Sequence, residues 1–267
     1  MFQYAVGRSL ALRRRQHLYL LTYKLDKEQP VRSYGLDIFN IVARVGIPSD
    51  VSSTIHLLWT VQERDCSFQS EIFDLSPGHI CLDGFWQSEK YFSEIAADLR
   101  ERDFSFSGDR TEDLGEIGRQ IQDCQAICVH VRLTDYLINH SHMGFVGLSY
   151  YNEAMKFVSE RIDDPFFVVF SDDLQWCRKN LKLDHPHVFA PEGLNEGTHF
   201  RLMTLCRHFI IANSTFSWWA AWLSKSPNKV VIAPKQWFSG EPARIFVPYL
   251  MRVLDSSDLV PPKWIRM

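Results

Sequence analysis

"HFIIANSTFSWWAAWLSKSPNKVVIA", residues 208–233, decides the fold of this chain. The apolar runs at 208–212 and 229–233 are typical of buried strands, and the segment 215–225 between them has the length of a helix. Two buried strands joined by a helix form a βαβ unit, in which both strands lie parallel in one sheet. The stretch therefore predicts an α/β fold.

The rest of the second half repeats this alternation. Further buried strands are predicted at 126–131, 165–170 and 187–190. Helices are predicted at 149–162, 173–181, 197–206 and 241–254. Apolar strands that alternate with helices are typical of a parallel sheet covered on both faces. We therefore expect a Rossmann-like lobe over residues 126–267.

The first half is less regular and is expected to form a second α/β lobe over residues 1–125. Apolar residues at helical spacing predict a helix at the start of the chain, within residues 2–12. Strands are predicted at 17–22 and 79–82, and helices at 87–103 and 112–124. The boundary is placed near residue 125, immediately before the first buried strand of the second lobe.

The composition is that of a globular chain, with 46% hydrophobic and 23% charged residues among 267. The net charge of −3 argues against a nucleic-acid partner, which requires a basic face. Arg13–Arg15 is the densest basic cluster; we interpret it as a solvated helix end, with a membrane or phosphate patch as the alternative.

The six cysteines contain no C-x-x-C pair, and several lie in apolar runs, which favours free thiols in a reducing compartment. No apolar stretch approaches the ~18 residues of a membrane span, and the N-terminus does not resemble a secretory leader. We expect a cytoplasmic protein, and peripheral contact with the inner face of a membrane stays open.

Ligands of open parallel sheets bind at the carboxyl ends of the strands, so residues that follow each strand are the candidates for a site. Arg132 stands at the end of the strand at 126–131, and His130 lies two residues before it. An arginine is a permanently charged fork that suits phosphate oxygens. The alternative is a structural ion pair between Arg132 and Asp135.

Ser171, Asp172 and Asp173 follow the strand at 165–170. They can cap the next helix, or their carboxylates can accept hydrogen bonds from a base or a ribose. A metal site is the less favoured interpretation, because no further ligands stand nearby in the sequence.

Polar residues also crowd the start of the helix after the strand at 208–212. They are Asn213, Ser214, Thr215 and Ser217, with Phe216 among them. A helix start with exposed N–H groups and hydroxyls favours an anion. Trp218 and Trp222 share a face of this helix, which favours core packing over stacking on a substrate.

The three strand ends together offer an arginine, a pair of carboxylates and a hydroxyl-rich helix start. This combination suits a nucleoside diphosphate bound without a metal. No glycine-rich phosphate loop and no G-x-G-x-x-G motif is present, which argues against the usual NTPase and dinucleotide-binding proteins.

The chain resembles the bacterial α-1,2-fucosyltransferases (glycosyltransferase family 11) in a series of motifs. They are MFQYAVGRSLAL (1–12), GFWQSEKYF (84–92), HVRLTDY (130–136), FVVFSDDLQW (167–176), LMTLCRHFIIANSTFSWWAAWL (202–223) and KVVIAPKQWF (229–238). The block from 202 to 238 is the most specific of these, and the resemblance covers nearly the whole chain.

This resemblance implies a GT-B-like fold, in which two Rossmann-like lobes face a cleft. It implies a donor, GDP-β-L-fucose, bound by the C-terminal lobe. It also implies transfer with inversion to the 2-hydroxyl of a terminal galactoside in a glycan, with no metal and no cofactor. The residues alone point to the lobe and the diphosphate, but they do not name either sugar.

The resemblance also implies roles for the site residues. Arg132 should hold the diphosphate and stabilise the departing GDP, and His130 should orient Arg132 or touch the phosphates. Asp172 or Asp173 should bind guanine or ribose, whereas Ser214, Thr215 and neighbouring amides should bind phosphate oxygens. The transition state should resemble an oxocarbenium ion. Asp135, His140 and His142 are the candidates for the base that activates the acceptor hydroxyl.

The sequence departs from the family at several positions. Leu133 stands where the motif has a second arginine, and His199 where relatives often have aspartate. Relatives also carry a strand and a G-G-L-G-N-Q loop before the segment that matches Met1. We therefore expect the first lobe to lack its first strand, and this form to be less stable and less active than one with those residues.

Three other functions remain as alternatives. The chain could be a truncated or non-catalytic relative that binds a nucleotide sugar, it could use another GDP-sugar or form another linkage, or it could be a nucleotide-binding oxidoreductase. The missing dinucleotide fingerprint weighs against the last of these.

Overall fold

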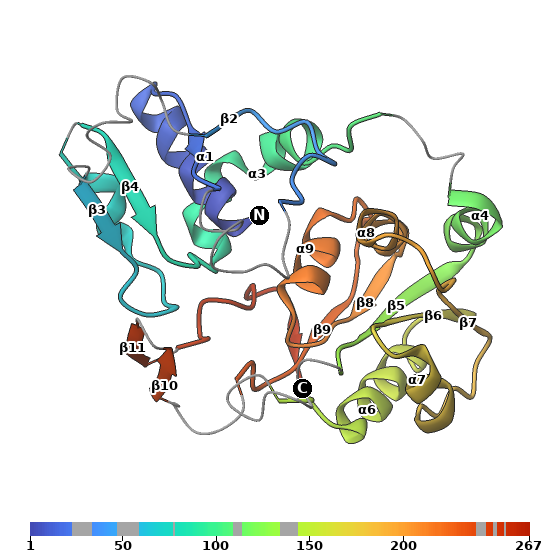
Figure 1. The fold of residues 1–267 in the computed structure, drawn as a ribbon. Coiled ribbons are helices and arrows are strands. Elements are labelled where there is room, and N and C mark those ends of the chain that lie inside the picture. Colours follow the sequence, from blue (N-terminus) through green and yellow to red (C-terminus); the bar gives the residue numbers. More distant parts are fainter. Residues whose placement is uncertain are drawn as a thin grey trace. The chain divides into compact units, whose positions relative to one another are not determined.

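The computed structural model divides the chain into two compact units (Figure 1). Unit 1 comprises Met1–Asp109 and Arg252–Pro261, and unit 2 comprises Arg110–Met251 and Pro262–Met267. The structure describes residues 1–22, 34–46, 59–76, 78–108, 114–133, 144–238, 244–247, 250–253 and 255–267. The division falls earlier than the expected boundary near residue 125, and one later segment returns to unit 1.

Unit 2 contains a six-stranded parallel sheet with the order β12-β9-β8-β5-β6-β7, which confirms the expected α/β class. Its strands are β5 (Gln125–Val131), β6 (Pro165–Ser171), β7 (His187–Phe189), β8 (His208–Ile210), β9 (Val231–Ala233) and β12 (Ile265–Arg266). All but the last were predicted from apolar runs. The facing of two lobes across a cleft stays a prediction.

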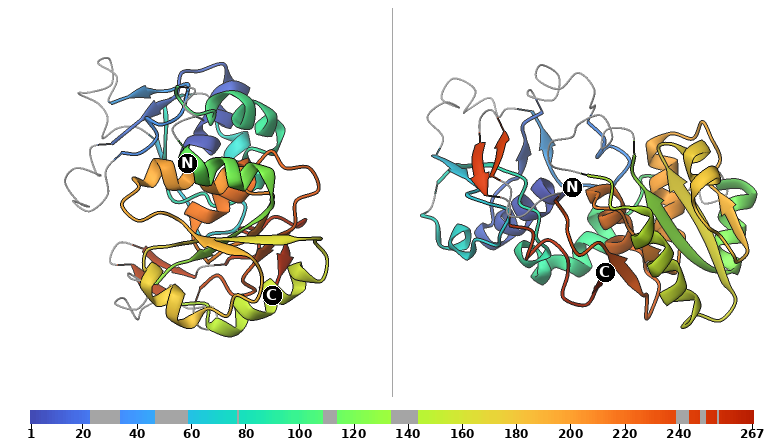
Figure 2. Two further views of the ribbon diagram at one scale, coloured as in Figure 1. Left: turned by 90° about the vertical axis from the view of Figure 1, so that its right-hand side faces the viewer. Right: turned by 90° about the horizontal axis from the view of Figure 1, so that it is seen from below.

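Helices cover both faces of this sheet (Figures 1 and 2). They are α4 (Gly115–Asp123), α6 (Leu148–Ser159), α7 (Leu174–Asn180), α8 (Glu196–Leu205) and α9 (Thr215–Leu223). One face carries α6 and α7, and the other carries α4, α8 and α9. Ile127, Val129 and Val131 of β5 belong to the core under α6 and α7. Because side chains of a strand alternate, Cys128 and His130 face the opposite layer.

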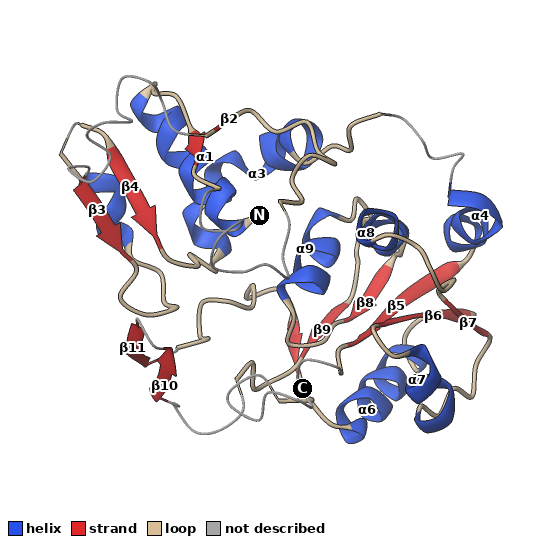
Figure 3. Cartoon of the chain, viewed as in Figure 1, coloured by secondary structure: helices blue, strands red, loops and turns tan. Residues whose placement is uncertain are grey.

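Unit 1 is built from one long helix and several short elements (Figure 3). Its helix α1 (Phe2–Arg14) matches the expected N-terminal helix. Two parallel strand pairs follow, β1 (Tyr19–Leu20) with β2 (Arg44–Val45), and β3 (Trp59–Gln62) with β4 (Ile80–Asp83). A single turn of 3-10 helix, η2 (Ser70–Asp74), lies between β3 and β4 in the sequence.

The helix expected at 87–103 is formed only in part, as a series of short turns: it is interrupted at Phe92, and from Ser93 to Asp103 the chain is helical without a further break. The turns are η3 (Glu89–Tyr91), η4 (Ser93–Ile95), α3 (Ala96–Asp98) and the π-helical η5 (Leu99–Asp103). Phe92 leaves helical geometry, with φ −135°, between the first two turns. Tyr91 and Phe92 are both buried, and packing of these rings takes precedence over helix propensity.

The helix expected at 241–254 is also absent, because the structure places strands β10 (Arg244–Val247) and β11 (Leu250–Val253) there. The sequence reads RIFVPYLMRV over 244–253. β-branched and aromatic residues favour strands, and Pro248 would break a helix at its centre. Helical periodicity was therefore the wrong signal in this segment.

The basic cluster at the end of α1 serves the local fold. The Arg14 guanidinium donates to the carbonyl oxygens of Leu75 and Ser76, and the Arg13 guanidinium lies 4.1 Å from the centre of the Phe73 ring. Arg15 adopts a left-handed conformation, φ 53°, that ends the helix. Among the residues that the structure describes, no helix has both the length and the apolar character of a membrane span.

Lys229 closes the carboxyl end of α9. Its Nζ donates to the carbonyl oxygens of Ala221 at 2.6 Å and Ser224 at 2.7 Å. Carbonyls in the last turn of a helix have no partner within the helix, and a cation there also offsets the helix dipole. The buried tryptophan-rich helix is therefore held at its end by a partly buried ammonium group.

We predict that Lys229→Met lowers the free energy of unfolding by about 1–2 kcal/mol. Urea denaturation measures this change. The control is Lys225→Met, at an exposed residue near the same helix end, which should cost less than about 0.5 kcal/mol. Equal losses in the two variants would show that only general charge near the helix end matters.

Candidate functional site

The strand order of unit 2 places the carboxyl ends of β8, β5 and β6 side by side. Val129 of β5 pairs with Ile210 of β8, and Val131 of β5 pairs with Ser171 of β6. The chain moves from β5 outward to β6 and β7, and then returns to β8 on the other side of β5. A reversal of this kind is the topological switch point where ligands of open α/β sheets bind.

Arg132 and Asp172 meet at this edge. Arg132 Nε lies 3.5 Å from Asp172 Oδ2, and the Leu133 N–H donates to Asp172 Oδ1 at 2.9 Å. Asp172 therefore joins the end of β6 to the segment that leaves β5. The Arg132 side chain is 35% exposed, whereas that of Asp172 is 16% exposed. The arginine can thus face a ligand while the carboxylate fixes its direction.

Asp173 and Ser171 serve the start of α7. Asp173 accepts a hydrogen bond from the Trp176 N–H at 2.8 Å and is the N-cap of the helix. Ser171 Oγ accepts one from the Asp173 N–H at 3.0 Å. Helix capping, which was one of the two interpretations of this motif, accounts for both contacts. Binding of guanine or ribose by these acids stays a prediction.

The start of α9 lies at the end of β8. Its N-cap, Ser214, makes no side-chain hydrogen bond to the helix, and no acidic residue lies in the first turn. Ser214, Thr215 and Phe216 are half-buried. The first N–H groups of a helix attract anions, so this end can take a phosphate.

Two neighbouring polar residues are used inside the protein. Asn213 Nδ2 donates to the carbonyl oxygens of Gly144 and Trp237, and its side chain is buried. Ser217 Oγ donates to the carbonyl oxygen of Ser214 at 3.2 Å, and this residue is also buried. Both side chains therefore support the start of α9 from within the protein. Of the predicted hydroxyls, Ser214 and Thr215 are the ones at the partly exposed turn.

His130 lies on the α8 and α9 face of the sheet, among aromatic rings. Its ring is 6.1 Å from that of Phe216, and Phe216 is 5.1 Å from Phe200. Burial and the positive charge of Arg132 lower the pKa of His130 to about 4, although the Asp172 carboxylate opposes this shift. His130 is therefore neutral near pH 7. Its Nδ1 is buried and has no hydrogen-bond partner among the described residues.

Two tyrosines of α6 support the site, and sequence analysis missed this role. Tyr151 Oη donates to the carbonyl oxygen of His130 at 3.0 Å. Tyr150 Oη donates to the carbonyl oxygens of Ile211 at 2.7 Å and Ile232 at 3.1 Å. Both hydroxyls bind backbone at the carboxyl edge. Two adjacent tyrosines at the start of a buried helix were the available signal.

The positions that depart from the family pattern have separate structural roles. Leu133 is 1% exposed and belongs to the core under α6 and α7. His199 of α8 lies with its ring 6.2 Å from that of Phe170, near His130. The candidate bases Asp135, His140 and His142 lie outside the described residues. Trp218 and Trp222 are buried and stacked at 6.1 Å, which confirms core packing.

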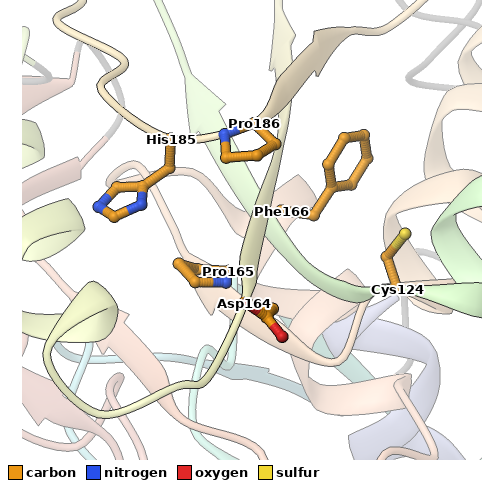
Figure 4. Close-up of a pocket in the computed structure, with 6 residues that line it drawn as sticks. All are labelled: Cys124, Asp164, Pro165, Phe166, His185 and Pro186. Carbon is orange, nitrogen blue, oxygen red and sulfur yellow. The ribbon is translucent and has the colours of Figure 1, made fainter.

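Two hollows among the described residues of unit 2 lie toward opposite edges of its sheet. One, of about 290 Å³, opens at the amino ends of β5, β6 and β7 (Figure 4). It is lined by Cys124, Asp164, Pro165, Phe166, His185 and Pro186. The other, of about 470 Å³, lies between α4, β7 and α8, and includes Pro191 and Thr198 beyond the carboxyl end of β7. Only the second shares an edge with Arg132, so the first is not part of this candidate site.

We predict that His130 makes the stability of the protein depend on pH. Its folded pKa of about 4 lies below the ordinary value of 6.5, so the unfolded chain binds the proton more tightly. Between pH 6.5 and 4, stability therefore falls as pH falls, by at most about 1.4 kcal/mol per pH unit from this group.

The measurement is the free energy of unfolding at several pH values for the wild-type protein and His130→Asn. The variant should show a shallower dependence over this window. His208, whose pKa burial also lowers, contributes equally to both proteins. Parallel curves would contradict the prediction.

Known proteins share this sequence pattern. The model of the family "Glycosyl transferase family 11" matches residues 71–244. An α-1,2-colitosyltransferase of Escherichia coli is 34% identical over 196 residues, which cover 71% of this chain and 63% of that protein. Galactoside α-(1,2)-fucosyltransferase 1 of Leontocebus fuscicollis is 30% identical over 200 residues, which cover 70% and 54%.

The chain thus spans less than two thirds of the length of these relatives. Among solved structures, the fucosyltransferase NodZ from Bradyrhizobium superposes with a TM-score of 0.49 and 15% identity over 86% of this chain and 89% of that chain. The family match alone covers more than half of the residues. The chain belongs to glycosyl transferase family 11.

Proposed function

We propose that this protein transfers L-fucose from GDP-β-L-fucose to the 2-hydroxyl of a terminal galactoside in a glycan. The observation that carries the proposal is the strand order: Arg132, paired with Asp172, follows β5, and the partly exposed start of α9 follows the neighbouring strand β8, so both belong to the switch-point edge of a family 11 sheet. Relatives named for α-1,2 transfer of fucose and of colitose support the linkage. The proposed transfer inverts the anomeric centre and needs neither metal nor cofactor.

The electrostatics of the edge suit the diphosphate of the donor. Arg132 supplies a fixed positive charge, and the first turn of α9 supplies N–H groups and the positive end of a helix dipole. Both gain as negative charge develops on GDP during departure, so they stabilise the transition state more than the ground state. Asp172 acts through Arg132 by setting its direction, because it binds both that side chain and the Leu133 N–H.

His130 contributes as a neutral group. A pKa of about 4 makes its imidazole a weak base that is neutral near pH 7 in the protein without a ligand. Hydrogen bonding or packing at the donor is the role that fits. The base for the acceptor hydroxyl is proposed among Asp135, His140 and His142.

One relative suggests a second candidate for the donor, GDP-colitose. The E. coli relative is named a colitosyltransferase, and colitose is the 3-deoxy counterpart of L-fucose. Both GDP-sugars present the same diphosphate and the same nucleotide to unit 2. A non-catalytic nucleotide-sugar-binding protein is the remaining alternative, and the replacement of a motif arginine by Leu133 favours it.

The deciding experiment measures GDP release from GDP-fucose and from GDP-colitose, each with and without lactose, together with GDP binding by calorimetry. We expect release from GDP-fucose that depends on lactose. Faster release from GDP-colitose would assign the second donor. Binding of GDP without release from either donor would establish the non-catalytic alternative.

We predict that Arg132→Gln lowers kcat by about 100-fold or more, since it removes charge stabilisation from the leaving group. Arg132→Lys keeps the charge but loses the fork, and should be intermediate. Steady-state kinetics with GDP-fucose as the varied substrate measures both. Arg161→Gln is the control, since Arg161 lies on the surface against Phe157 and Glu160. Unchanged turnover in Arg132→Gln would remove this residue from the mechanism.

A further inference from the structure

Residues 84–88 of unit 1 adopt a conformation that needs explanation. They follow β4 at the carboxyl end of the parallel pair β3–β4. Trp86 has a φ of 55°, in the left-handed region, although it is a bulky residue and is fully buried. Strained backbone of this kind persists only where the surrounding structure enforces it, and it is concentrated at functional sites.

A buried carboxylate enforces this conformation. Glu63 follows β3 and is 1% exposed. Its Oε2 accepts the Phe85 N–H at 2.7 Å, and its Oε1 accepts the Trp86 N–H at 2.9 Å. Burial of a carboxylate is costly, and here its two oxygens each bind a backbone N–H of this short segment.

The same segment is fixed on its other sides. Gln3 Nε2 of α1 donates to the Gly84 carbonyl oxygen at 2.8 Å. A Cβ at residue 84 would lie 2.4 Å from Glu63 Cβ, so only glycine fits there. The Trp86 indole packs edge-on against Tyr91 at 5.6 Å. Phe85 therefore projects from a rigid support and not from a mobile loop.

The two hydrogen bonds from the Phe85 and Trp86 N–H groups to Glu63 form a clamp on this segment. An exposed aromatic ring, that of Phe85, projects from it. Phe85 is 47% exposed, although the residues on both sides of it are fixed. Single exposed apolar side chains are common and need no explanation by themselves. Trp59 is also exposed, by 51%, at the opposite, amino end of β3. Phe85 differs from it because a buried carboxylate and a tryptophan in the left-handed region hold the backbone of Phe85 in place.

An exposed ring on a fixed backbone suits the apolar face of a sugar. The face of an aromatic ring carries partial negative charge, which attracts the slightly positive C–H groups of a pyranose. A galactose ring has an axial 4-hydroxyl, so the C–H bonds at C3, C4 and C5 form one continuous apolar face. A flat ring that is half exposed can cover this face without further change of the protein.

We propose that Phe85 is the aromatic platform against which the galactose ring of the acceptor packs, and that Glu63 and Trp86 are there to aim it. This inference rests on the proposed function for the identity of the sugar. Glu63 and Trp86 are positioning residues, since they act through Phe85 and do not touch the sugar.

The test combines binding and kinetics on Phe85→Ala, Phe85→Leu, Phe85→Tyr and the control Trp59→Ala. Binding of lactose to the GDP-loaded full chain is followed by saturation-transfer NMR, which needs no turnover. Kinetics gives the KM for lactose, the KM for GDP-fucose and the rate of GDP release without acceptor. Thermal unfolding checks that each variant is folded.

We expect Phe85→Ala to weaken lactose binding and raise the KM for lactose by about tenfold. Phe85→Leu should raise the KM for lactose by most of the same factor, because leucine keeps apolar volume but has no ring. In Phe85→Tyr and Trp59→Ala the KM for lactose should stay within about twofold of the wild type. The KM for GDP-fucose and the release of GDP without acceptor should not change in any variant.

Three results would overturn the proposal: unchanged lactose binding in Phe85→Ala, an equal loss in Trp59→Ala, or a change in the KM for the donor in place of that for lactose. Lactose binding that depends on Phe85 in a protein without transferase activity would refute the proposed function and leave the platform standing. Failure of the wild-type chain to bind lactose would refute the platform itself, even if GDP-fucose is hydrolysed.

Glu63→Gln tests the positioning role. An amide would present a donor to one of the two backbone N–H groups, so the clamp should loosen and the KM for lactose should rise. If Glu63 acts through Phe85, the double variant with Phe85→Ala should have the same KM for lactose as Phe85→Ala alone. Additive effects on KM would show that Glu63 only stabilises the fold. If Glu63→Gln does not fold, the Phe85 variants still decide the proposal.

Discussion

The candidate site depends on the contacts that the Asp172 carboxylate makes. Its two oxygens hold different parts of the same strand end, the Leu133 N–H and the Arg132 guanidinium. β5 and β6 are thereby joined at the edge where the chain order reverses. Without this contact, Arg132 would be a long side chain with several rotamers at the end of a strand. With it, the guanidinium is held toward Asp172 at the edge that the start of α9 shares, and charges oriented in advance stabilise a transition state with less reorganisation.

The sequence predicted the sheet of unit 2 because each of its main strands is a separate apolar run between helices. Arg132, Asp172 and Ser214 could be assigned to one edge for the same reason, since the parallel order alone brings strand ends together. The prediction at 87–103 failed in part, and that at 241–254 failed, where other interactions outweighed the local pattern. Buried rings broke the first helix, and strand-forming residues around Pro248 replaced the second.

The residues that sequence analysis missed act through contacts across long separations. Tyr150 and Tyr151 lie in a predicted helix, but their hydroxyls bind carbonyls of β5, of β9 and of the residue that follows β8, which no local pattern reports. Glu63 is one acidic residue among many until Phe85 and Trp86, more than twenty residues later, are seen to donate to it. The GFWQS motif identified the segment, but not the clamp behind it.

Leu133, in place of the second arginine of the motif, removes one positive charge from this edge of the sheet. Its side chain belongs to the core under α6 and α7, so an arginine at this position could not take the same place without burying its charge or leaving the core. His130 supplies no compensating charge, because burial and Arg132 keep it neutral. Arg132, partly offset by Asp172, and the backbone at the start of α9 therefore both contribute positive potential at this edge. Because the dipole of a helix is fixed by the backbone, the contribution of α9 does not depend on any one side chain, including the residue at position 133.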